Sequence, residues 1–282
     1  MKKKNATPLF LIRNCILILL IGVFSMQCTS SSSGNEQKEN GDQPVLRVMA
    51  YNIHHANPPS EPDLISPEAI ADVIRKEDPD LVALQEVDVN NRRSGEDLHQ
   101  AQAIAELLGM NFHFAKAIDY QGGFYGNAVL SKFPILDRMD VELPAMEDVD
   151  TEDRVWAGIK VEAHGEELWF GSTHLDYKTE ENNLYQSNLL LEGLRDIDIP
   201  VIIAGDFNVT EHSKTMQLFD EQFRRTCPDD CPPTIPVTNP RRAIDFIIYR
   251  PTDYFETLTH EVIDEQYASD HLPVVAELVV KK

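Results

Sequence analysis

The 282-residue sequence contains few positively charged residues. Lys and Arg together number 25 against 47 Asp and Glu, which gives a formal net charge of -22. Affinity for nucleic acids comes largely from Lys and Arg side chains that neutralise phosphates, and a strongly acidic chain repels polyanions. The composition therefore disfavours a DNA- or RNA-binding protein. Acidity would also keep a surface protein in solution, so the charge by itself identifies no function.

Cysteine is also scarce, with only Cys15, Cys28, Cys227 and Cys231 present. The spacing of the last two could begin a zinc site, but no second pair of Cys or His completes four ligands. In an oxidising compartment a short local disulfide is favoured for this pair, and two free thiols are the alternative. In either state the pair would hold a loop and take no part in chemistry.

No long apolar run is present near the N-terminus, where residues 15–24 form an apolar stretch of about ten residues. This stretch is too short to span a bilayer and follows Lys2, Lys3, Lys4 and Arg13, so residues 1–27 are predicted to be a signal peptide. The sequence before Cys28 resembles a lipoprotein cleavage site, although Gln27 is larger than the small residue usual there. An ordinary secretory signal with an incidental cysteine is the alternative.

Residues 29–44 contain no large apolar side chain and cannot offset the entropy of an ordered chain. We therefore expect residues 28–44 to be a lipidated Cys28 followed by a flexible tether. The expected protein is an exported, membrane-anchored lipoprotein of the bacterial cell envelope. Residues 1–27 carry four positive groups and no acidic ones, so their removal brings the net charge from -22 to near -26.

Residues 45–282 are numerous enough for one domain with a single core, and no internal repeat is evident. Alternating or continuous apolar runs predict strands over 45–50, 80–84, 124–130, 134–141, 155–161, 167–172, 200–204, 243–249, 256–262 and 273–279. Helical periodicity and capping residues predict helices that begin near Ser66, at 98–108, at 180–196 and at 214–219. This order predicts an α/β domain of mixed sheets with helices outside.

Six polar motifs lie beside these apolar runs. They are Tyr51-Asn52-Ile53, Leu84-Gln85-Glu86-Val87, Ser172-Thr173-His174-Leu175-Asp176, Gly205-Asp206-Phe207-Asn208, Ile244-Asp245-Phe246-Ile247 and Ser269-Asp270-His271-Leu272-Pro273. Carboxylates, amides and an Asp-His pair at strand ends are the groups that metal-assisted phosphodiester cleavage needs. In this order, over residues 45–280, the set resembles the endonuclease/exonuclease/phosphatase superfamily.

The resemblance implies a four-layer α/β sandwich of two facing mixed β-sheets flanked by helices, with the active site at one end of the sheets. It implies Glu86 as the principal ligand of Mg²⁺ or Mn²⁺, with Asn52 and Asp270 as companions. Carboxylate and amide oxygens are the ligands that such hard cations prefer. Asp206 and Asn208 are further candidate metal ligands, and their i, i+2 spacing lets them face the same side of a strand.

By the same resemblance, Asp206 orients or deprotonates the attacking water and Asn208 contacts metal or a phosphoryl oxygen. His271 needs a carboxylate to hold its second ring nitrogen, and Asp245 takes that role. His174 contacts the phosphate. Tyr125, Asn127 and Arg154 are less specific candidates for the catalytic and substrate-binding set, and each could instead serve packing or lie at the surface.

These residues predict a divalent-metal-dependent phosphoesterase that hydrolyses a phosphodiester by water attack. A nuclease or an inositol phosphatase would carry clusters of Lys and Arg, which are scarce near the motifs, so a small or phospholipid- or sphingolipid-type diester is favoured. The alternatives are a nuclease acting on DNA or RNA and a catalytically inactive binding lipoprotein. We expect a monomer that meets the membrane through Cys28 and forms no stable complex with nucleic acid.

The lipoprotein prediction is tested by metabolic labelling with a fatty acid. Wild-type protein should incorporate the label, and the Cys28→Ser variant should not, because lipid would be attached at that thiol. Equal labelling of both proteins, or labelling of neither, would show that Cys28 is not the anchor.

Overall fold

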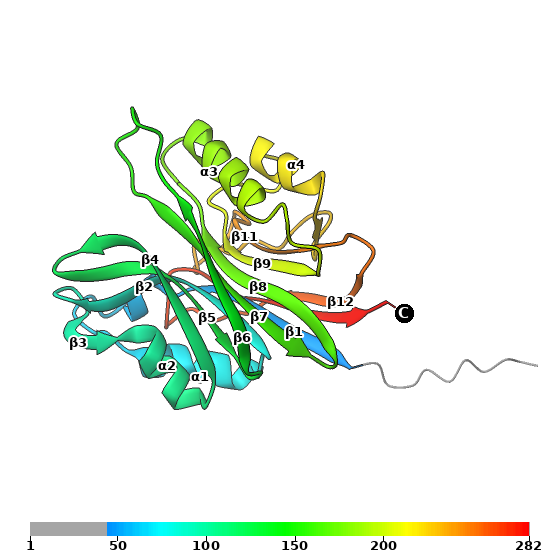
Figure 1. Ribbon diagram of the computed structural model, residues 1–282. Helices are drawn as coiled ribbons and strands as arrows, with labels where there is room; N and C mark the ends of the chain where they lie inside the picture. Colours follow the sequence, from blue (N-terminus) through cyan, green and yellow to red (C-terminus); the bar gives the residue numbers. More distant parts are fainter. Residues whose placement is uncertain (1–43, 282) are drawn as a thin grey trace, which may run out of the picture. The chain divides into compact units, whose positions relative to one another are not determined.

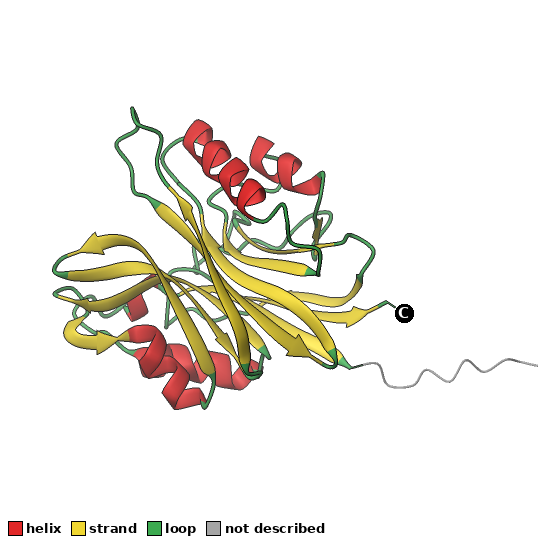
Figure 2. Ribbon diagram, viewed as in Figure 1, coloured by secondary structure: helices red, strands yellow, loops and turns green. Residues whose placement is uncertain are grey.

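The computed structural model describes residues 44–281, so the predicted signal peptide, Cys28 and all but the last residue of the predicted tether lie outside the described residues. The described chain forms two facing β-sheets with helices on their outer faces (Figures 1 and 2). This is the four-layer α/β sandwich that the sequence predicts. No helix in this part of the chain is long and apolar enough to cross a membrane.

The first sheet has seven strands, and two helices lie against its outer face. The elements are β1 (Val45–Asn52), β2 (Leu81–Asn91), β3 (Gly95–His99), β4 (Asn111–Tyr120), β5 (Gly123–Ser131), β12 (Phe255–Val262), β13 (Val274–Val280), α1 (Pro67–Glu77) and α2 (Gln100–Leu108). The strand order is β12-β13-β1-β2-β5-β4, and β3 pairs with β2. The pair β1–β2 is parallel and the other pairs are antiparallel.

The second sheet has six strands, and the other two helices cover it. The elements are β6 (Ile135–Leu143), β7 (Arg154–Ala163), β8 (Glu166–His174), β9 (Val201–Asp206), β10 (Arg224–Arg225), β11 (Asp245–Arg250), α3 (Glu180–Gly193) and α4 (Lys214–Asp220). The strand order is β10-β11-β9-β8-β7-β6, in which only β8–β9 is parallel. The strands β7 and β8 form a hairpin that turns at His164 and Gly165, with Ala163 opposite Glu166.

Successive residues of a strand point to opposite faces of its sheet, and this alternation builds the layers. In β1, Val48 and Ala50 enter the core between the sheets, whereas Met49 packs on the helix side with Ile70 and Ile74 of α1. The helices begin at side-chain caps, as at Ser66, whose Oγ accepts from the Ala69 N–H at 3.2 Å.

The sequence analysis was wrong about where β2 ends. We expected Glu86 at the end of a strand over residues 80–84, but β2 continues to Asn91 and Glu86 lies inside it. The pairing of β2 with β5 shifts between Leu84 and Val87, and Glu86 has a φ of 60°. Such an irregularity adds a residue to one strand and turns a side chain away from its regular direction, which local alternation does not predict.

Three strands were not predicted, namely β3, β4 and β10. The strand β4 is an edge strand with only one fully buried residue, Ala115, and β10 has only two residues. Short or half-exposed strands lack the apolar run that identifies a buried one. After β10 the chain passes through Cys227 and Cys231, which are joined in a disulfide with Cα atoms 5.3 Å apart.

Candidate active site

The site forms where strand ends of the two sheets meet. Asp206 is the last residue of β9, and in the sheet it lies between His174 of the parallel strand β8 and Asp245 of the antiparallel strand β11. Asn52, the last residue of β1, comes from the other sheet. All four side chains are buried. Residues separated by more than 190 positions in the sequence thus share one polar cluster.

Asp206 is the centre of this cluster. Its Oδ2 lies 3.2 Å from Asn52 Nδ2, 3.6 Å from His174 Nε2 and 3.8 Å from His271 Nε2, and its Oδ1 accepts from the Asn208 N–H at 2.8 Å. Burial, together with the charge of Asp245, raises the pKa of Asp206 to about 7, against the opposing effects of His271, Asn208 and Asn52. A carboxylate with such a pKa can exchange a proton near neutral pH.

His271 is held by Asp245, as the sequence analysis expected. The His271 Nδ1 lies 3.0 Å from Asp245 Oδ2, which leaves Nε2 directed toward Asp206. Burial alone would lower the pKa of His271, but the charge and hydrogen bond of Asp245, with Asp206 and Asp270, outweigh it and raise that pKa to about 10. The ring can therefore carry a proton at Nε2 while Asp245 fixes its orientation.

A residue that the sequence analysis missed holds Asp245 in turn. The buried hydroxyl of Thr234 donates to Asp245 Oδ2 and accepts from the Ile244 N–H at 3.3 Å. The carbonyl of Thr234 also accepts a hydrogen bond at 2.9 Å from the N–H of Leu272, the residue that follows His271 in the chain. Thr234 therefore positions both members of the Asp245–His271 pair. It lies in an irregular Pro-rich segment with no motif around it, so the sequence offered no signal.

Glu86 faces the same cluster because of the irregularity in β2. Its Oε1 accepts from Asn52 Nδ2 at 3.1 Å, and its Oε2 lies 3.8 Å from His55 Nδ1. Burial would raise the pKa of Glu86. Hydrogen bonding by His55 and Asn52 and electrostatic interactions with His174 and His271 outweigh burial, and they hold that pKa well below its usual range. Glu86 therefore presents a carboxylate anion, the form that binds a cation.

These side chains open into a cavity of about 270 Å³. Its lining comprises Glu86, Tyr125, Glu152, Arg154, His174, Tyr177, Asp206, Asn208, Arg242 and His271. Seven of these were candidates from the sequence, namely Glu86, Tyr125, Arg154, His174, Asp206, Asn208 and His271. The other three, Glu152, Tyr177 and Arg242, were not predicted. Each lies within two residues of a candidate or a motif in the sequence but belongs to no motif itself.

Arg154 is the buried cation of the cavity. Its Nη1 lies 3.5 Å from His174 Nδ1 and 3.3 Å from Glu152 Oε2. Burial, with the positive charges of Arg154 and His271, holds the pKa of His174 well below its usual range, although Glu86 opposes this. Burial and the charge of Glu86 raise the pKa of Tyr125 well above its usual range, so the phenol keeps its proton. Arg154, neutral His174 and Tyr125 can all donate hydrogen bonds to an oxyanion.

Four candidates from the sequence do not line the cavity, namely Asn52, Asn127, Asp245 and Asp270. Asn52 and Asp245 nevertheless contact lining residues, Asp206 and His271 respectively. Asn127 does not line the cavity, and its Nδ2 donates to the Val155 carbonyl at 2.7 Å, a bond between the two sheets. Asp270 also is not among the lining residues, although its charge acts on His271. Its Oδ1 is buried and has no hydrogen-bond partner among residues 44–281.

The donor atoms fit a hard divalent cation. The Asn52 Nδ2 donates to both Glu86 Oε1 and Asp206 Oδ2, so the two carboxylates lie on the same amide group. The buried Oδ1 of Asp270 has no hydrogen-bond partner among residues 44–281, and carboxylate oxygens are the ligands that hard cations prefer. A second set, Asp206, Asp245 and His271, offers ligand atoms within 4.8 Å of one another. Because Asp245 already binds both His271 and Thr234, the oxygen-rich set around Glu86 is the better candidate.

Comparison with known proteins identifies the family that the sequence motifs resemble. A family model described as "Endonuclease/Exonuclease/phosphatase family" matches residues 49–271. The uncharacterized protein YbhP of Escherichia coli K12 is 26% identical over 248 residues, which cover 83% of this chain and 96% of YbhP.

Solved structures share the fold. An endonuclease/exonuclease/phosphatase from Beutenbergia cavernae is 26% identical with a TM-score of 0.68, over 84% of this chain and 72% of that one. The mannosyl-6-phosphatase of Bacteroides thetaiotaomicron is 22% identical with a TM-score of 0.66, over 83% of this chain and 99% of that one. At this lower identity the likeness shows the fold alone.

Replacement of Thr234 by Val tests its positioning role. We expect kcat to fall about ten- to hundredfold, because a buried hydrogen bond to a charged group is lost, while KM changes little. Thr234→Ser restores the hydroxyl and should restore kcat, which a purely packing role would not explain. A Val variant with wild-type kcat, or a Ser variant as slow as the Val variant, would contradict the assignment.

The variants Asp206→Ala and His271→Ala should each lower kcat by about 10²–10⁴-fold, because each removes a group that handles a proton. The double variant should be little slower than either single one, since the two groups act as a unit. The His113–Asp140 pair, 2.6 Å apart and outside the cavity, supplies the matched control, and its alanine variants should keep kcat. Steady-state kinetics with circular dichroism checks the rates and the fold, and additive losses would refute the coupling.

Proposed function

The chain belongs to the endonuclease/exonuclease/phosphatase family, and from that premise we propose that this phosphoric ester hydrolase cleaves a phosphodiester that is small or carried by a lipid. The observation that supports the proposal is the cavity around Asp206, which combines carboxylates for a cation with neutralising groups for one phosphate. Its cationic side chains are Arg154, Arg242 and the protonated His271. Substrates with several phosphates would need a larger cluster of Lys and Arg.

A divalent cation is expected at Asn52, Glu86 and Asp270, with Asp206 and Asn208 close by, and Mg²⁺ or Mn²⁺ suits these oxygen donors. When bound, it would supply Lewis-acid stabilisation of the negative charge on the phosphate oxygens. The protein contributes a carboxylate at Glu86, whose lowered pKa keeps it ionised near neutral pH.

The proposed division of labour among the side chains follows from their distances. Asp206 Oδ2 is the acceptor for the proton of the attacking water. The side chain of Asn52 and the N–H of Asn208 hold the two carboxylate oxygens of Asp206 in place. His271 holds a proton at Nε2, 3.8 Å from Asp206, while Asp245 fixes its other nitrogen. Arg154 and His174 bind the non-bridging phosphate oxygens, which carry the growing negative charge.

The preference for a small or lipid-borne diester rests on charge. The mature chain would carry a net charge near -26, because the first 27 residues hold four positive groups and no acidic one. Glu152, at the mouth of the cavity, adds a negative charge beside Arg154. We also propose that Cys28 anchors the domain to a membrane, which would bring a lipid head group within reach.

Removal of the metal should abolish activity. Hydrolysis of bis-p-nitrophenyl phosphate should stop after exhaustive chelation and return with Mg²⁺ or Mn²⁺. Glu86→Gln should also lose the rise in melting temperature that Mn²⁺ gives wild-type protein, a readout of metal binding that needs no turnover. Glu106→Gln, an exposed change on α2, is the control. Full activity in chelator would disprove the metal requirement.

Double-stranded DNA should be a poor substrate compared with bis-p-nitrophenyl phosphate or sphingomyelin. The difference should be widest in dilute buffer, because the repulsion between two polyanions is least screened there. Initial rates on plasmid DNA and on small diesters, measured across a salt series, check this. Faster cleavage of plasmid DNA at low salt, slowing as salt rises, would reveal a basic groove and favour the nuclease alternative. No turnover of plasmid DNA, bis-p-nitrophenyl phosphate or sphingomyelin would favour the alternative of a catalytically inactive binding lipoprotein.

A further inference from the structure

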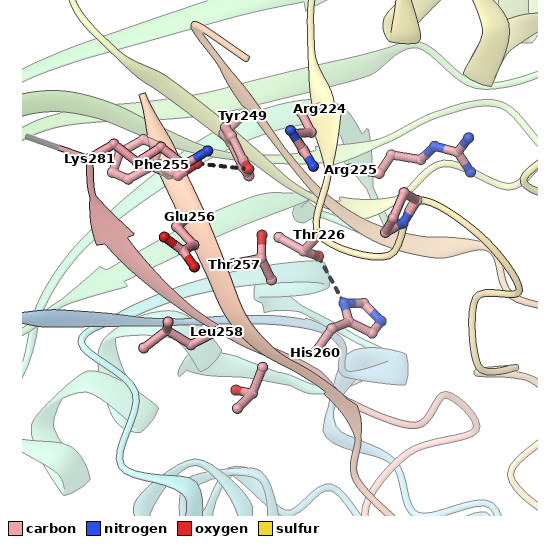
Figure 3. A pocket seen from close by; sticks show the side chains of 12 residues that line it. Arg224, Arg225, Thr226, Tyr249, Phe255, Glu256, Thr257, Leu258, His260 and Lys281 are labelled. Atoms are coloured by element: carbon pink, nitrogen blue, oxygen red, sulfur yellow. Dashed lines mark hydrogen bonds between the residues drawn. The ribbon is translucent and has the colours of Figure 1, made fainter. Parts of the chain in front are cut away.

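A second and larger cavity, of about 520 Å³, lies at the open side of the sandwich. It is bordered by β12, the outermost strand of one sheet, and by β10, the outermost strand of the other (Figure 3). None of its lining residues lines the candidate active site. Cavities of several hundred Å³ are the usual size for small-molecule sites.

The pairing of β12 with β13 turns polar side chains into this space. The register shifts between Thr257 and Thr259, so that both Thr257 and His260 lie opposite core residues, Leu278 and Ala276. The result is a polar patch at the edge of the apolar core. The hydroxyl of Thr226, which follows β10, lies 2.8 Å from His260 Nδ1 and links the two sheets across the cavity (Figure 3).

One polar atom in this patch has no partner. Thr257 Oγ1 is buried and makes no hydrogen bond with any residue from 44 to 281. In Figure 3 its side chain lies opposite that of Arg224. A buried hydroxyl without a partner is unfavourable by about 1–3 kcal/mol, so a hydrogen-bonding ligand beside it would remove a cost that the protein otherwise carries.

The charges of the cavity are mainly positive, although the chain as a whole is strongly acidic. Arg224 and Lys281 line it, and neither forms an ion pair with any residue in the described range 44–281. Arg225 is different, because it extends to Asp220 at 2.9 Å. Glu256 is the one acidic lining residue, and His260 is neutral at pH 7 because burial lowers its pKa to about 4.

The cavity also has an apolar part, which is formed by Pro228, Tyr249, Phe255 and Leu258. Tyr249 and Phe255 are fully buried and contact each other edge to face, with ring centroids 5.4 Å apart. The Tyr249 hydroxyl donates to the Phe255 carbonyl at 3.2 Å, so it is not available to a ligand. Leu258 is exposed, so an organic group could lie against its side chain while a charged group meets Arg224 and Lys281.

We propose that this cavity, between the edge strands β10 and β12, binds the phosphate-monoester group of an organic molecule. Arg224 and Lys281 offer only donors, and a free Thr257 hydroxyl can donate a third hydrogen bond, which together match the several acceptor oxygens of a phosphate. A cationic ligand would be repelled by the two charges. A neutral ligand would gain nothing from them.

The probe is inorganic phosphate, titrated into the full domain while the NMR signals of the Thr257 methyl group and the His260 ring are followed. Both signals should shift and saturate. Arg224→Gln should weaken this binding at least about tenfold, because it removes a charge-assisted hydrogen bond. Arg138→Gln is the matched control, since Arg138 is also exposed but lies on β6, the opposite edge of the same sheet. Neither change should alter the rate of diester hydrolysis.

Thr257→Val separates a binding role from a structural one. Replacing an unpartnered buried hydroxyl by a methyl group should leave the melting temperature unchanged or higher, yet weaken phosphate binding. A lower melting temperature with unchanged phosphate affinity would mean that the hydroxyl serves the fold and would overturn its assignment.

A second arm identifies the source of the phosphate group. Vesicles containing phosphatidate, whose head group is a phosphate monoester, are compared with phosphatidylcholine vesicles in co-sedimentation. Binding to phosphatidate that depends on Arg224 would assign the site to a lipid head group, and a response to free phosphate alone would assign it to a small molecule. The proposal fails if neither probe binds in a manner that depends on Arg224. Because hydrolysis is measured separately, that failure leaves the proposed catalytic function untouched.

Discussion

Two buried carboxylates, Asp206 and Asp245, lie directly opposite each other on neighbouring strands. Like charges this close repel strongly where little water screens them, so the surroundings must compensate. Compensation comes from His271 between them, from the hydroxyl of Thr234 and from the amide of Asn52. Burial, with the remaining repulsion from Asp245, raises the pKa of Asp206 to about 7. The same burial that packs the pair therefore lets Asp206 exchange a proton near neutral pH.

The cluster contains residues from both sheets, so it depends on how the sheets are fixed against each other. Buried polar contacts supply this near the site. Ser172 Oγ of one sheet donates to the Leu84 carbonyl of the other at 2.8 Å and accepts from Gln85 Nε2 at 2.8 Å. Asn127 adds its bond to Val155. Gln85 and Val155 adjoin Glu86 and Arg154 in the chain, so a displacement of one sheet would separate Glu86 from Arg154.

The two cavities show different uses of positive charge in an acidic chain. In the candidate active site, Arg154 is buried and shared between His174 and Glu152. In the cavity between β10 and β12, Arg224 and Lys281 are exposed and have no acidic partner in the described chain, which suits a ligand that brings its own negative charge. This second cavity lies between β10 and β12, which are the terminal strands of the two sheets.

The sequence by itself determined the layered fold and most of the residues that gather in the candidate active site. Alternating apolar residues and helix caps are local signals, and the ordered motifs around Asn52, Glu86, His174, Asp206, Asp245 and His271 carry the family resemblance. Only the tertiary structure decided that Glu86 lies within β2, that Asn127 bonds to Val155, that Thr234 supports Asp245 and that Thr257 faces a cavity. Each of these depends on a strand irregularity or on a contact between distant segments, and neither leaves a periodic pattern in the chain.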